Sequence, residues 1–429
     1  MPAAASTASV IPTADMMSVK DFGAKGDGAA DDTAALKRAF EAGGRMFVPS
    51  GTYLIDTPQS GGGGGVKAIL ASSLEVVCDP RAKFIANSER FLDATMISFH
   101  AAPSATGLRV MWRGCMVDLT HTKNSTVTPY SGNFPPTYPG KSSVTDGVDF
   151  RGAYLRNGHY VAGFAEVSID GSWFAAGTHW QTAGGDSALF VEGAERVAVT
   201  NNNFQASLDA ALYLSRDNAG ESKAGNAIIS GNRFLNCQIG VALKRSFLRA
   251  ILTGNTFQNT TVAIVFTSAG QASGDEAVIS NNIIEGAAAG VRLDDTDNVA
   301  VVGNLFYNGG ARNQNGEAFT AIYASPAAIL LNGATRTFIS SNRVYGTNPQ
   351  YRNYGLDGVY FASGKFNGAP AKNVIVGNYF GNIGCAVHEE FSGAGADRTY
   401  SGNVVQNSEC RNLPEINHPI DDKASEEVK

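Results

Sequence analysis

Cysteine is scarce in this chain, and its spacing argues against the common metal sites. The 429 residues contain five cysteines, and no two of them form a C-x-x-C pair. Because structural zinc sites usually need that spacing, the sequence predicts no metal centre. The odd number also argues against a full disulfide framework. We therefore interpret Cys78, Cys115, Cys237, Cys385 and Cys410 as small buried apolar residues.

Charged residues are also few, at 17% of the chain, and they show no basic excess. The formal net charge is −6 and the isoelectric point is about 5.6. A nucleic-acid partner needs a basic surface that displaces counterions, so we expect none. No apolar run is long enough to span a membrane, and residues 1–17 lack the basic start and apolar core of a signal peptide. The chain is then cytosolic, exported by another route, carried on a particle or shown without its leader.

What the sequence does contain is a phrase that returns from about residue 171 to residue 405. It consists of a small residue or Asn, then usually Asn, then any residue, then an apolar or aromatic one, as in 201–204, 231–234 and 254–257. Its second position falls at 172, 202, 232, 255, 282, 304, 342, 378 and 403, so the spacings run from 22 to 38 residues. A period in this range is typical of a repeat architecture.

The residues around each phrase predict strands. A short alternating apolar run precedes it, as in 196–200, and another follows it, as in 211–214. Such alternation, rich in Val and Ile, is typical of strands, and Asn and Gly favour a corner between them. Each repeat is therefore strand, corner, strand and loop. Since one repeat cannot bury its apolar side chains alone, the repeats must stack, and the sequence predicts a parallel β-helix.

The N-terminal region predicts a cap for the open end of this solenoid. Asp32 or Thr33 can cap a helix that ends at the glycine pair 43–44, and residues 45–55 then read as strand, turn and strand. A helix over the first coil would cover its edge. We expect a flexible lead over 1–17, the cap segment over 18–56, the β-helix over 57–410 with a long loop at 121–144, and a polar tail over 411–429.

Two stretches resemble a known family. VKDFGAKGDGAADDTAALKRAF (19–40) and MFVPSGTYLI (46–55) closely resemble the N-terminal signature of the pectate-lyase-like superfamily. The resemblance implies an all-β fold, a single-stranded right-handed parallel β-helix with an N-terminal helix cap. It implies polysaccharide-active relatives: hydrolases, lyases, epimerases and phage tailspike depolymerases. It also implies structural roles for the signature's aspartates, an extracellular or particle-associated protein, and a homotrimer, for which the aromatic loop at 121–144 is the only local support.

Stacking allows side chains of successive coils to be aligned. The window 186–193 aligns with 209–216, 238–245, 261–268 and 288–295. In this alignment two columns point inward, one formed by Leu212, Val241, Ile264 and Val291, the other by Leu214, Leu243, Phe266 and Leu293. By alternation the first, fifth and seventh residues of each window point outward.

The outward positions predict the catalytic residues Asp186, Asp209 and Glu192. Asp186 and Asp209 would lie one strand spacing apart, ~5 Å, and Glu192 roughly 20 Å along the strand from Asp186. Two carboxylates so close cannot both ionise easily, so one becomes a general acid. A separation of ~5 Å suits a retaining glycosidase and ~6.5–9.5 Å an inverting one. The alternative is that both aspartates cap backbone amides.

Other residues near this face predict substrate binding. The rings of Trp180 and Tyr213 offer flat faces to sugars, and the cations of Arg216, Lys244 and Arg245 can hold acidic substituents. His179 and His159 are further candidates. The triplet 388–390, His-Glu-Glu, is polar enough for a second site, but nothing else in the sequence converges on it.

The reaction is less defined than the fold. Polygalacturonase-like hydrolases carry an Asn-x-Asp, an Asp-Asp and a Gly-His-Gly on adjacent coils; this sequence has no Asp-Asp in the corresponding coil and no Gly-His-Gly, and the aspartate cluster of Ca²⁺-dependent lyases is thin. We expect cleavage of glycosidic bonds in a polysaccharide or oligosaccharide by carboxylates, without a cofactor. One alternative is a lyase or uronate epimerase with Lys244 or Arg245 as base, for which Ca²⁺ is the implied cofactor. The other is a noncatalytic glycan-binding or phage-tail structural protein.

Overall fold

The computed structural model describes most of the repeat region and parts of both ends. The described residues are 15–56, 65–86, 95–102, 105, 107–119, 128–133, 142–146, 149–152, 159–162, 165–175, 187–205, 210–215, 225–244, 249–267, 276–309, 327–346, 356–363, 370–389 and 398–408.

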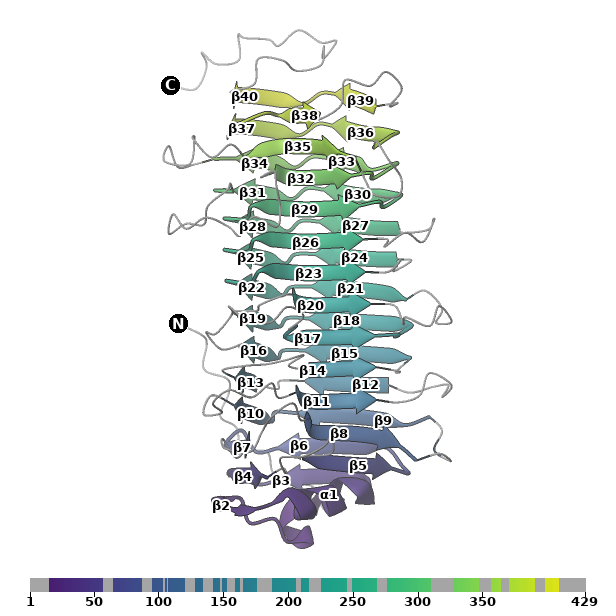
Figure 1. Cartoon of the computed structure of the whole chain (residues 1–429), viewed down its shortest axis with the longest axis vertical. Coiled ribbons are helices and arrows are strands. Elements are labelled where there is room, and N and C mark those ends of the chain that lie inside the picture. Colours follow the sequence, from purple (N-terminus) through teal and green to yellow (C-terminus); the bar gives the residue numbers. More distant parts are fainter. Residues whose placement is uncertain are drawn as a thin grey trace.

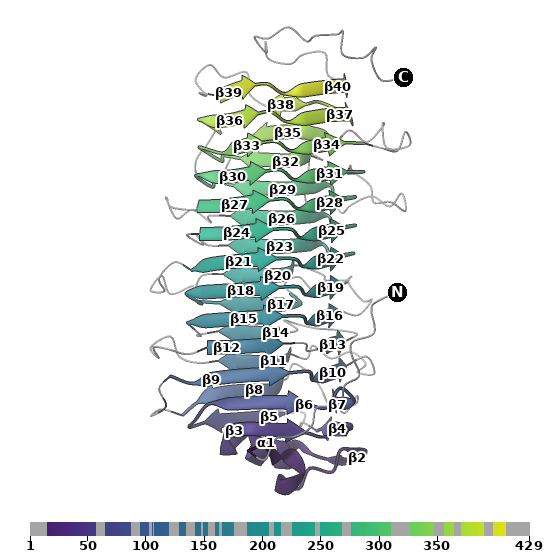
Figure 2. The ribbon, with the colours of Figure 1, turned by 180° about the vertical axis from the view of Figure 1, so that it is seen from behind.

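The chain forms one long stack of coils with three parallel sheets along its sides (Figure 1). Seen from behind, the stack continues from one end to the other without a break (Figure 2). Each coil contributes one strand to sheet A, then one to sheet B, then one to sheet C, except that the first and last coils have no described strand in sheet C; the strands pair in parallel. The predicted right-handed parallel β-helix is confirmed.

The sheets have the following members. Sheet A has 14 strands: β1 (Met17–Ser18), β3 (Gly44–Val48), β6 (Leu74–Cys78), β9 (Arg109–Arg113), β12 (Ser142–Asp146), β15 (Glu166–Asp170), β18 (Arg196–Thr200), β21 (Asn226–Ser230), β24 (Arg249–Thr253), β27 (Glu276–Ser280), β30 (Val299–Val302), β33 (Phe338–Ser340), β36 (Asn373–Val376) and β39 (Arg398–Ser401). Sheet B has 14 strands: β2 (Asp27–Asp31), β4 (Gly51–Ile55), β7 (Ala82–Ala86), β10 (Met116–Leu119), β13 (Asp149–Gly152), β16 (Trp173–Ala175), β19 (Asn203–Gln205), β22 (Arg233–Leu235), β25 (Thr256–Gln258), β28 (Ile283–Glu285), β31 (Leu305–Tyr307), β34 (Arg343–Tyr345), β37 (Tyr379–Ile383) and β40 (Val404–Ser408). Sheet C has 12 strands: β5 (Val66–Leu70), β8 (Thr95–Ala101), β11 (Thr128–Asn133), β14 (His159–Ala162), β17 (Leu189–Glu192), β20 (Ala210–Ser215), β23 (Ile239–Lys244), β26 (Val262–Thr267), β29 (Ala289–Asp294), β32 (Ala327–Asn332), β35 (Asp357–Ala362) and β38 (Val387–Glu389).

Two details differ from the sequence interpretation. The end of each recurring phrase is itself a short strand of sheet B, so a coil has three strands instead of two. The segment 121–144, expected to be one loop, contains β11 and the start of β12, which pair with their neighbours in sheets C and A. Its Ser, Thr, Gly and Pro residues hide the alternation that marks strands elsewhere.

The asparagines of the phrase form a buried ladder at the corner between sheets A and B. Asn202, Asn232, Asn255, Asn282, Asn304, Asn342 and Asn378 are each 1% exposed. From Asn232 onward the Oδ1 accepts hydrogen bonds from the backbone N–H and the Nδ2 of the asparagine one coil earlier, as between Asn232 and Asn255 at 3.0 Å each, whereas Asn202 Oδ1 accepts from the backbone N–H of Ser172. The phenylalanines stack beside them, with ring centroids 4.7–4.9 Å apart from Phe174 to Phe257. The phrase therefore stabilises the coil and carries no chemistry.

The N-terminal end is closed by a short 3-10 helix, η1 (Val19–Phe22), and by α1 (Thr33–Ala42). In both views α1 lies beneath the first coils, and its Leu36 and Phe40 are fully buried (Figures 1 and 2). The signature aspartates bind backbone amides: Asp32 accepts from Lys25 and Gly26, and Asp27 from Ala29 and Ala30. These bonds agree with the structural roles that the resemblance implies.

The four described cysteines are buried, as expected, but at least three of them are disulfide-bonded, which the sequence interpretation did not predict. Cys78 and Cys115 form a disulfide with Cα atoms 4.9 Å apart, and Cys385 is also disulfide-bonded. Cys237 is free and buried, as expected. The register of the irregular early coils explains the miss: Val77 pairs with Arg113 across one coil, which brings positions 37 apart in sequence together.

Reducing the disulfides should destabilise the protein without removing its fold. Closing the 37-residue loop between Cys78 and Cys115 is expected to contribute about 4 kcal/mol, mainly by restricting the unfolded chain. A Cys78→Ala/Cys115→Ala variant should therefore melt at a lower temperature than the wild type, measured by circular dichroism. Adding reductant should lower the wild-type melting temperature and affect the variant less. Equal melting temperatures for wild type and variant would contradict this.

Candidate functional site

The alignment of windows predicted for sheet C is correct. Leu212 pairs with Val241, Val241 with Ile264 and Ile264 with Val291, and all four are fully buried. The second inward column is also present and buried. The register places Glu192 beside Ser215 and Ser215 beside Lys244, so Glu192 and Lys244 lie two coils apart on one face.

The outer face of sheet C differs from the outer faces of the other sheets. Strands of sheet A alternate between exposed and buried residues, whereas β23, β26 and β32 are buried at five successive positions. The outward-facing Ala242 and Val265 are 0% and 5% exposed. A strand covered on both faces reads as a continuous apolar run. Part of the face predicted to be open is therefore covered, and its polar side chains stand in a sheltered setting.

The structure describes three of the nine predicted site residues. They are Glu192, Tyr213 and Lys244, all half-buried on this outer face. The other six lie outside the described residues: Asp186, Asp209, Trp180, His179, Arg216 and Arg245. The ~5 Å separation of Asp186 and Asp209 stays a prediction. Of His159 only the backbone in β14 is described.

Tyr213 and Lys244 lie together with Phe190, and we call these three residues the aromatic–lysine cluster. Glu192 lies on the same face. The rings of Phe190 and Tyr213 meet edge to face, with centroids 4.6 Å apart. The ammonium nitrogen of Lys244 lies 4.8 Å from the centre of the Tyr213 ring, within the range of a cation–π contact. An apolar surface, a cation and a carboxylate thus share one sheltered patch.

Farther along the same face, Asp294 is held by three neighbours. It accepts hydrogen bonds from Arg292 Nε at 2.8 and 2.9 Å, from Asn332 Nδ2 at 3.0 Å and from Thr267 Oγ1 at 3.4 Å. Both its carboxylate oxygens are occupied. These contacts join three adjacent coils, and they give Asp294 a structural role instead of a catalytic one.

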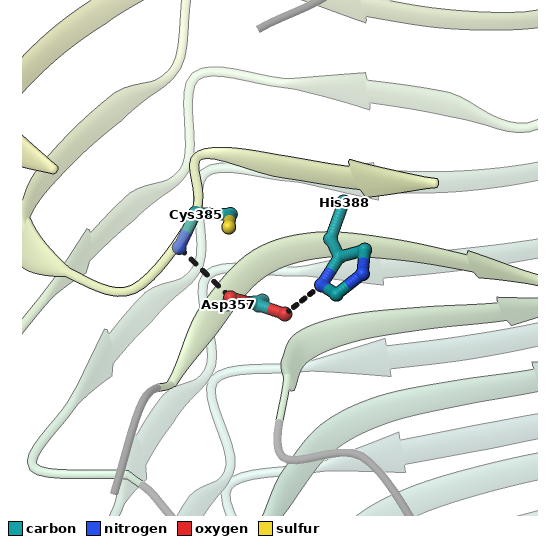
Figure 3. Close-up of side chains that lie close together, drawn as sticks. All are labelled: Asp357, Cys385 and His388. Atoms are coloured by element: carbon teal, nitrogen blue, oxygen red, sulfur yellow. Dashed lines mark hydrogen bonds and ion pairs between the residues drawn. The ribbon is translucent and has the colours of Figure 1, made fainter. Parts of the chain in front are cut away.

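A third polar group lies near the C-terminal end of sheet C, where Figure 3 shows Asp357 between Cys385 and His388. Asp357 Oδ2 accepts from His388 Nδ1 at 2.8 Å, and Oδ1 accepts from the backbone N–H of Cys385 at 2.8 Å. The His388 ring lies 4.6 Å from the Tyr360 ring and pairs with it across β35 and β38. The carboxylate fixes the imidazole so that Nε2 is the basic atom, and the side chain is 44% exposed.

Asp357, Cys385 and His388 lie close enough together to suggest a metal centre, but the state of the Cys385 sulfur argues against it. Donor atoms of Asp357, Cys385 and His388 all lie within 4.8 Å of one another. Cys385 is disulfide-bonded, however, and so has no thiolate to offer. A carboxylate and one imidazole remain, which are too few for a closed site.

The expectation that nothing converges on the triplet 388–390 was wrong. Besides Asp357 and Tyr360 on His388, Glu389 accepts from Tyr400 Oη at 2.7 Å and pairs with Arg398. The Arg398 guanidinium lies 4.3 Å from the centre of the Phe361 ring. Burial, reinforced by the bond to Glu389, raises the pKa of Tyr400 well above its usual range. The partners come from positions up to 31 residues away, on both sides of the triplet, so local sequence gave no signal.

Two family models match separate parts of the chain. The model described as rhamnogalacturonase A/epimerase, pectate lyase-like, matches residues 16–132. The model described as periplasmic copper-binding protein (NosD) matches residues 142–327. Within the described residues of that second range, no three His, Cys, Asp or Glu side chains lie close enough to hold a metal ion.

Solved structures with the same fold cover most of the chain. The mannuronan C-5 epimerase AlgE6 A-module of Azotobacter vinelandii aligns with 90% of this chain and 98% of its own, at 15% identity and a TM-score of 0.55. Tailspike protein 3 of bacteriophage CBA120 aligns with 94% of this chain and 64% of its own, at 14% identity and a TM-score of 0.55. At these identities the likeness shows the fold alone.

Curated relatives match only short segments. A glucan 1,3-beta-glucosidase of Cochliobolus carbonum is 46% identical over 55 residues, 9% of this chain and 7% of that protein. Mannuronan C5-epimerase AlgE3 of Azotobacter vinelandii is 52% identical over 42 residues, 9% of this chain and 2% of that protein. The chain therefore has the right-handed parallel β-helix fold, and its residues 16–132 match the pectate lyase-like family model.

No helix in the described part of the chain is both long and apolar enough to cross a membrane.

Proposed function

We propose that this protein is a carbohydrate-active enzyme that cleaves glycosidic bonds of a polysaccharide or oligosaccharide on the outer face of sheet C. The aromatic–lysine cluster carries the proposal. The half-buried Tyr213 ring offers apolar surface to a sugar ring, and Lys244 can donate hydrogen bonds to hydroxyl or acidic groups. Glu192 supplies a carboxylate on the same face for proton transfer or nucleophilic attack.

Two further observations support this reading. Asp186 and Asp209 precede β17 and β20, so an acid/base pair on the same side of the sheet would complete the chemistry. The curated relatives with short matches are a glucosidase and an epimerase, both of which act on carbohydrates. The chemistry proposed here is hydrolysis or glycosyl transfer and requires no cofactor.

A panel of neutral and acidic polysaccharides tests the proposal. Reducing ends should appear without the absorbance of an unsaturated uronate, because hydrolysis creates a hemiacetal and no double bond. Both signals together indicate a lyase. Neither signal across the panel, with glycan binding retained, would support a noncatalytic glycan-binding or phage-tail structural protein and overturn the enzyme proposal.

A second candidate function is proton abstraction next to a carboxylate, as a polysaccharide lyase or uronate epimerase performs it. The observation that favours it is the imidazole of His388, which Asp357 orients and Tyr360 flanks. His388 would be the base, in place of the Lys244 or Arg245 considered from sequence. Ca²⁺ would be a candidate cofactor for a lyase of this kind.

Substitution of His388 separates the two candidates. If the second candidate holds, His388→Gln should lower lyase or C5 hydrogen-exchange activity on a polyuronate about 100-fold, the typical contribution of a general base. Under the first candidate the same variant should cleave as well as the wild type. Lys244→Gln serves as the comparison, because it removes the other base without touching Asp357.

We place the protein outside the cytoplasm, as a secreted or particle-associated protein. Its disulfides support this placement, since disulfides persist mainly in oxidising compartments. Reductant sensitivity of the isolated protein and its recovery from culture medium or from particles are the checks.

A further inference from the structure

A group of tyrosines stands on the outer face of sheet B, near the C-terminal end of the solenoid. Tyr307, Tyr345 and Tyr379 lie on β31, β34 and β37, three consecutive coils that Figure 2 shows stacked on one another. Each is next to a core residue in its strand, so alternation directs the tyrosines outward, and all three are half-buried. The rings of Tyr307 and Tyr345 stack with centroids 6.2 Å apart. The chemistry proposed for sheet C uses none of them.

The Tyr379 ring is held in one place along its own strand. A β-carbon at Gly381 would lie 2.8 Å from both Cε1 and Oη of Tyr379, so the ring occupies the space that a side chain at Gly381 would take. The Tyr379 hydroxyl donates a hydrogen bond to Gln406 Oε1 at 2.7 Å, and Gln406 pairs with Gly381 from the next coil. Glycine therefore lets the ring lean along the strand, and Gln406 fixes it there.

Arg343 brings a cation to the same group. It lies two residues before Tyr345, pairs in register with Tyr379, and is exposed. Its guanidinium has no ion-pair or hydrogen-bond partner in the part of the chain that the structure describes. Arg196 and Arg249 on sheet A, in contrast, are each paired with a glutamate. An unpaired guanidinium beside aromatic rings is available to an anion.

The charge around the tyrosines is positive. The strands β34, β37 and β40 contain one charged residue, Arg343. Glu285 lies two coils before Tyr345 in the same column, and its carboxylate already accepts from Gln258 Nε2 at 3.2 Å. Burial and this carboxylate together raise the pKa of Tyr307, so its hydroxyl stays protonated and able to donate.

We propose that these residues form a second glycan site, for sugars that carry a carboxylate. We call it the tyrosine–arginine patch: Tyr307, Tyr345, Tyr379, Arg343 and Gln406. The guanidinium holds the sugar carboxylate through two parallel hydrogen bonds. The tyrosine rings pack against the C–H groups of the sugar, and their hydroxyls and the Gln406 amide bond to sugar hydroxyls. No bond is made or broken here, so the proposal does not depend on the reaction on sheet C.

The dimensions fit a short stretch of one glycan chain. From Tyr307 to Gly381 the patch spans two strand spacings, about 10 Å, roughly the length of a disaccharide. Across the strand it measures about 7 Å, from Arg343 to Tyr345. This area is far below the ~800 Å² that a stable protein partner covers. One cation is also too few for a nucleic acid, which needs a row of basic side chains.

The experiment measures binding of galacturonate and mannuronate hexamers to the full chain by isothermal titration calorimetry. The starting chain carries Tyr213→Ala and Lys244→Gln, so the aromatic–lysine cluster of sheet C contributes no binding. It should bind a uronate hexamer. Adding Arg343→Gln should weaken that binding about 10- to 100-fold, because a charge-assisted pair of hydrogen bonds is lost. The methyl ester of the galacturonate hexamer lacks the charge, so Arg343→Gln should not change its binding.

Two further variants test the ring and the specificity of the charge. Gly381→Ala adds a methyl group where the Tyr379 ring lies and should displace it from Gln406, weakening binding of the hexamer and its methyl ester at least about tenfold. Alanine suits a strand at least as well as glycine, so circular dichroism should show retained folding. Arg109→Gln is the matched control, because it removes an exposed arginine from β9 of sheet A and should bind like the starting chain.

Failure of the starting chain to bind either uronate hexamer would overturn the proposal and leave a protein partner as the alternative for this face. Equal losses in Arg343→Gln and Arg109→Gln, or unchanged binding in Gly381→Ala, would also overturn it. Arg343→Gln in the otherwise wild-type chain should cleave short oligosaccharides at the wild-type rate. Loss of cleavage therefore bears on sheet C, and loss of hexamer binding bears on sheet B.

Discussion

Replacing Glu192 by glutamine should lower polysaccharide cleavage about 100-fold, the smaller end of the usual contribution of an acid/base group. Glutamine keeps the shape and hydrogen-bonding capacity of the side chain but can neither deliver nor accept the proton. Because Glu192 lies on the outer face, next to Ser215 and two coils from Lys244, the change should leave the folded core intact. Initial rates of reducing-end release at saturating substrate measure the effect.

The control is Glu195→Gln, three residues further along the chain, where the side chain is exposed and outside sheet C. This variant should keep wild-type activity and the same melting temperature. Asp186→Asn and Asp209→Asn complete the series, and each should also lose about two orders of magnitude if the pair supplies acid and base. Full activity in all three carboxylate variants would place the site elsewhere.

Replacing Asn255 by leucine should cost about 5 kcal/mol of folding free energy. Its Oδ1 accepts from the backbone N–H and the Nδ2 of Asn232, and its Nδ2 donates to Asn282 Oδ1 and to the carbonyl of Ile229. Leucine leaves three buried polar groups without these partners, each at ~1–3 kcal/mol. Urea unfolding followed by circular dichroism measures the loss.

Two variants show whether the loss comes from the ladder. Asn226→Ala removes an exposed asparagine of sheet A and should change stability by less than about 0.5 kcal/mol. Asn255→Asp retains the acceptor for Asn232 but cannot donate to Ile229 or Asn282, so it should be destabilising as well. A loss at Asn255→Leu no greater than that at Asn226→Ala would show that the ladder contributes little.

The coil register was predictable because the recurring phrase marks the same corner in every coil. Aligning the windows between successive phrases by their apolar columns places Glu192, Ser215 and Lys244 side by side without any tertiary information. The partners of His388 were not predictable in this way. Asp357 lies 31 residues earlier, and the long insertion before it obscures the alignment of that coil.

The sheltering of sheet C could have been inferred but was missed. Strict alternation predicts that Ala242 and Val265 face solvent, and they do point outward, yet both are buried. The run Val262–Phe266 contains no polar residue, which is typical of a strand covered on both sides.

The disulfide between Cys78 and Cys115 depends on the register of irregular coils that lack the phrase, and no local sequence pattern predicts it.

The positions of the disulfides have a consequence for proteolysis. In a stack where each coil touches only its neighbours, the terminal coils hold one neighbour instead of two and therefore fray first. Cys78 and Cys115 lie in the early coils, and Cys385 lies just before β38, the last strand of sheet C. Disulfide-bonded cysteines therefore lie close to both ends of the stack, where the coils open most easily. Digestion in reductant should trim the chain inward from its ends, while the central asparagine-lined coils survive as a resistant fragment.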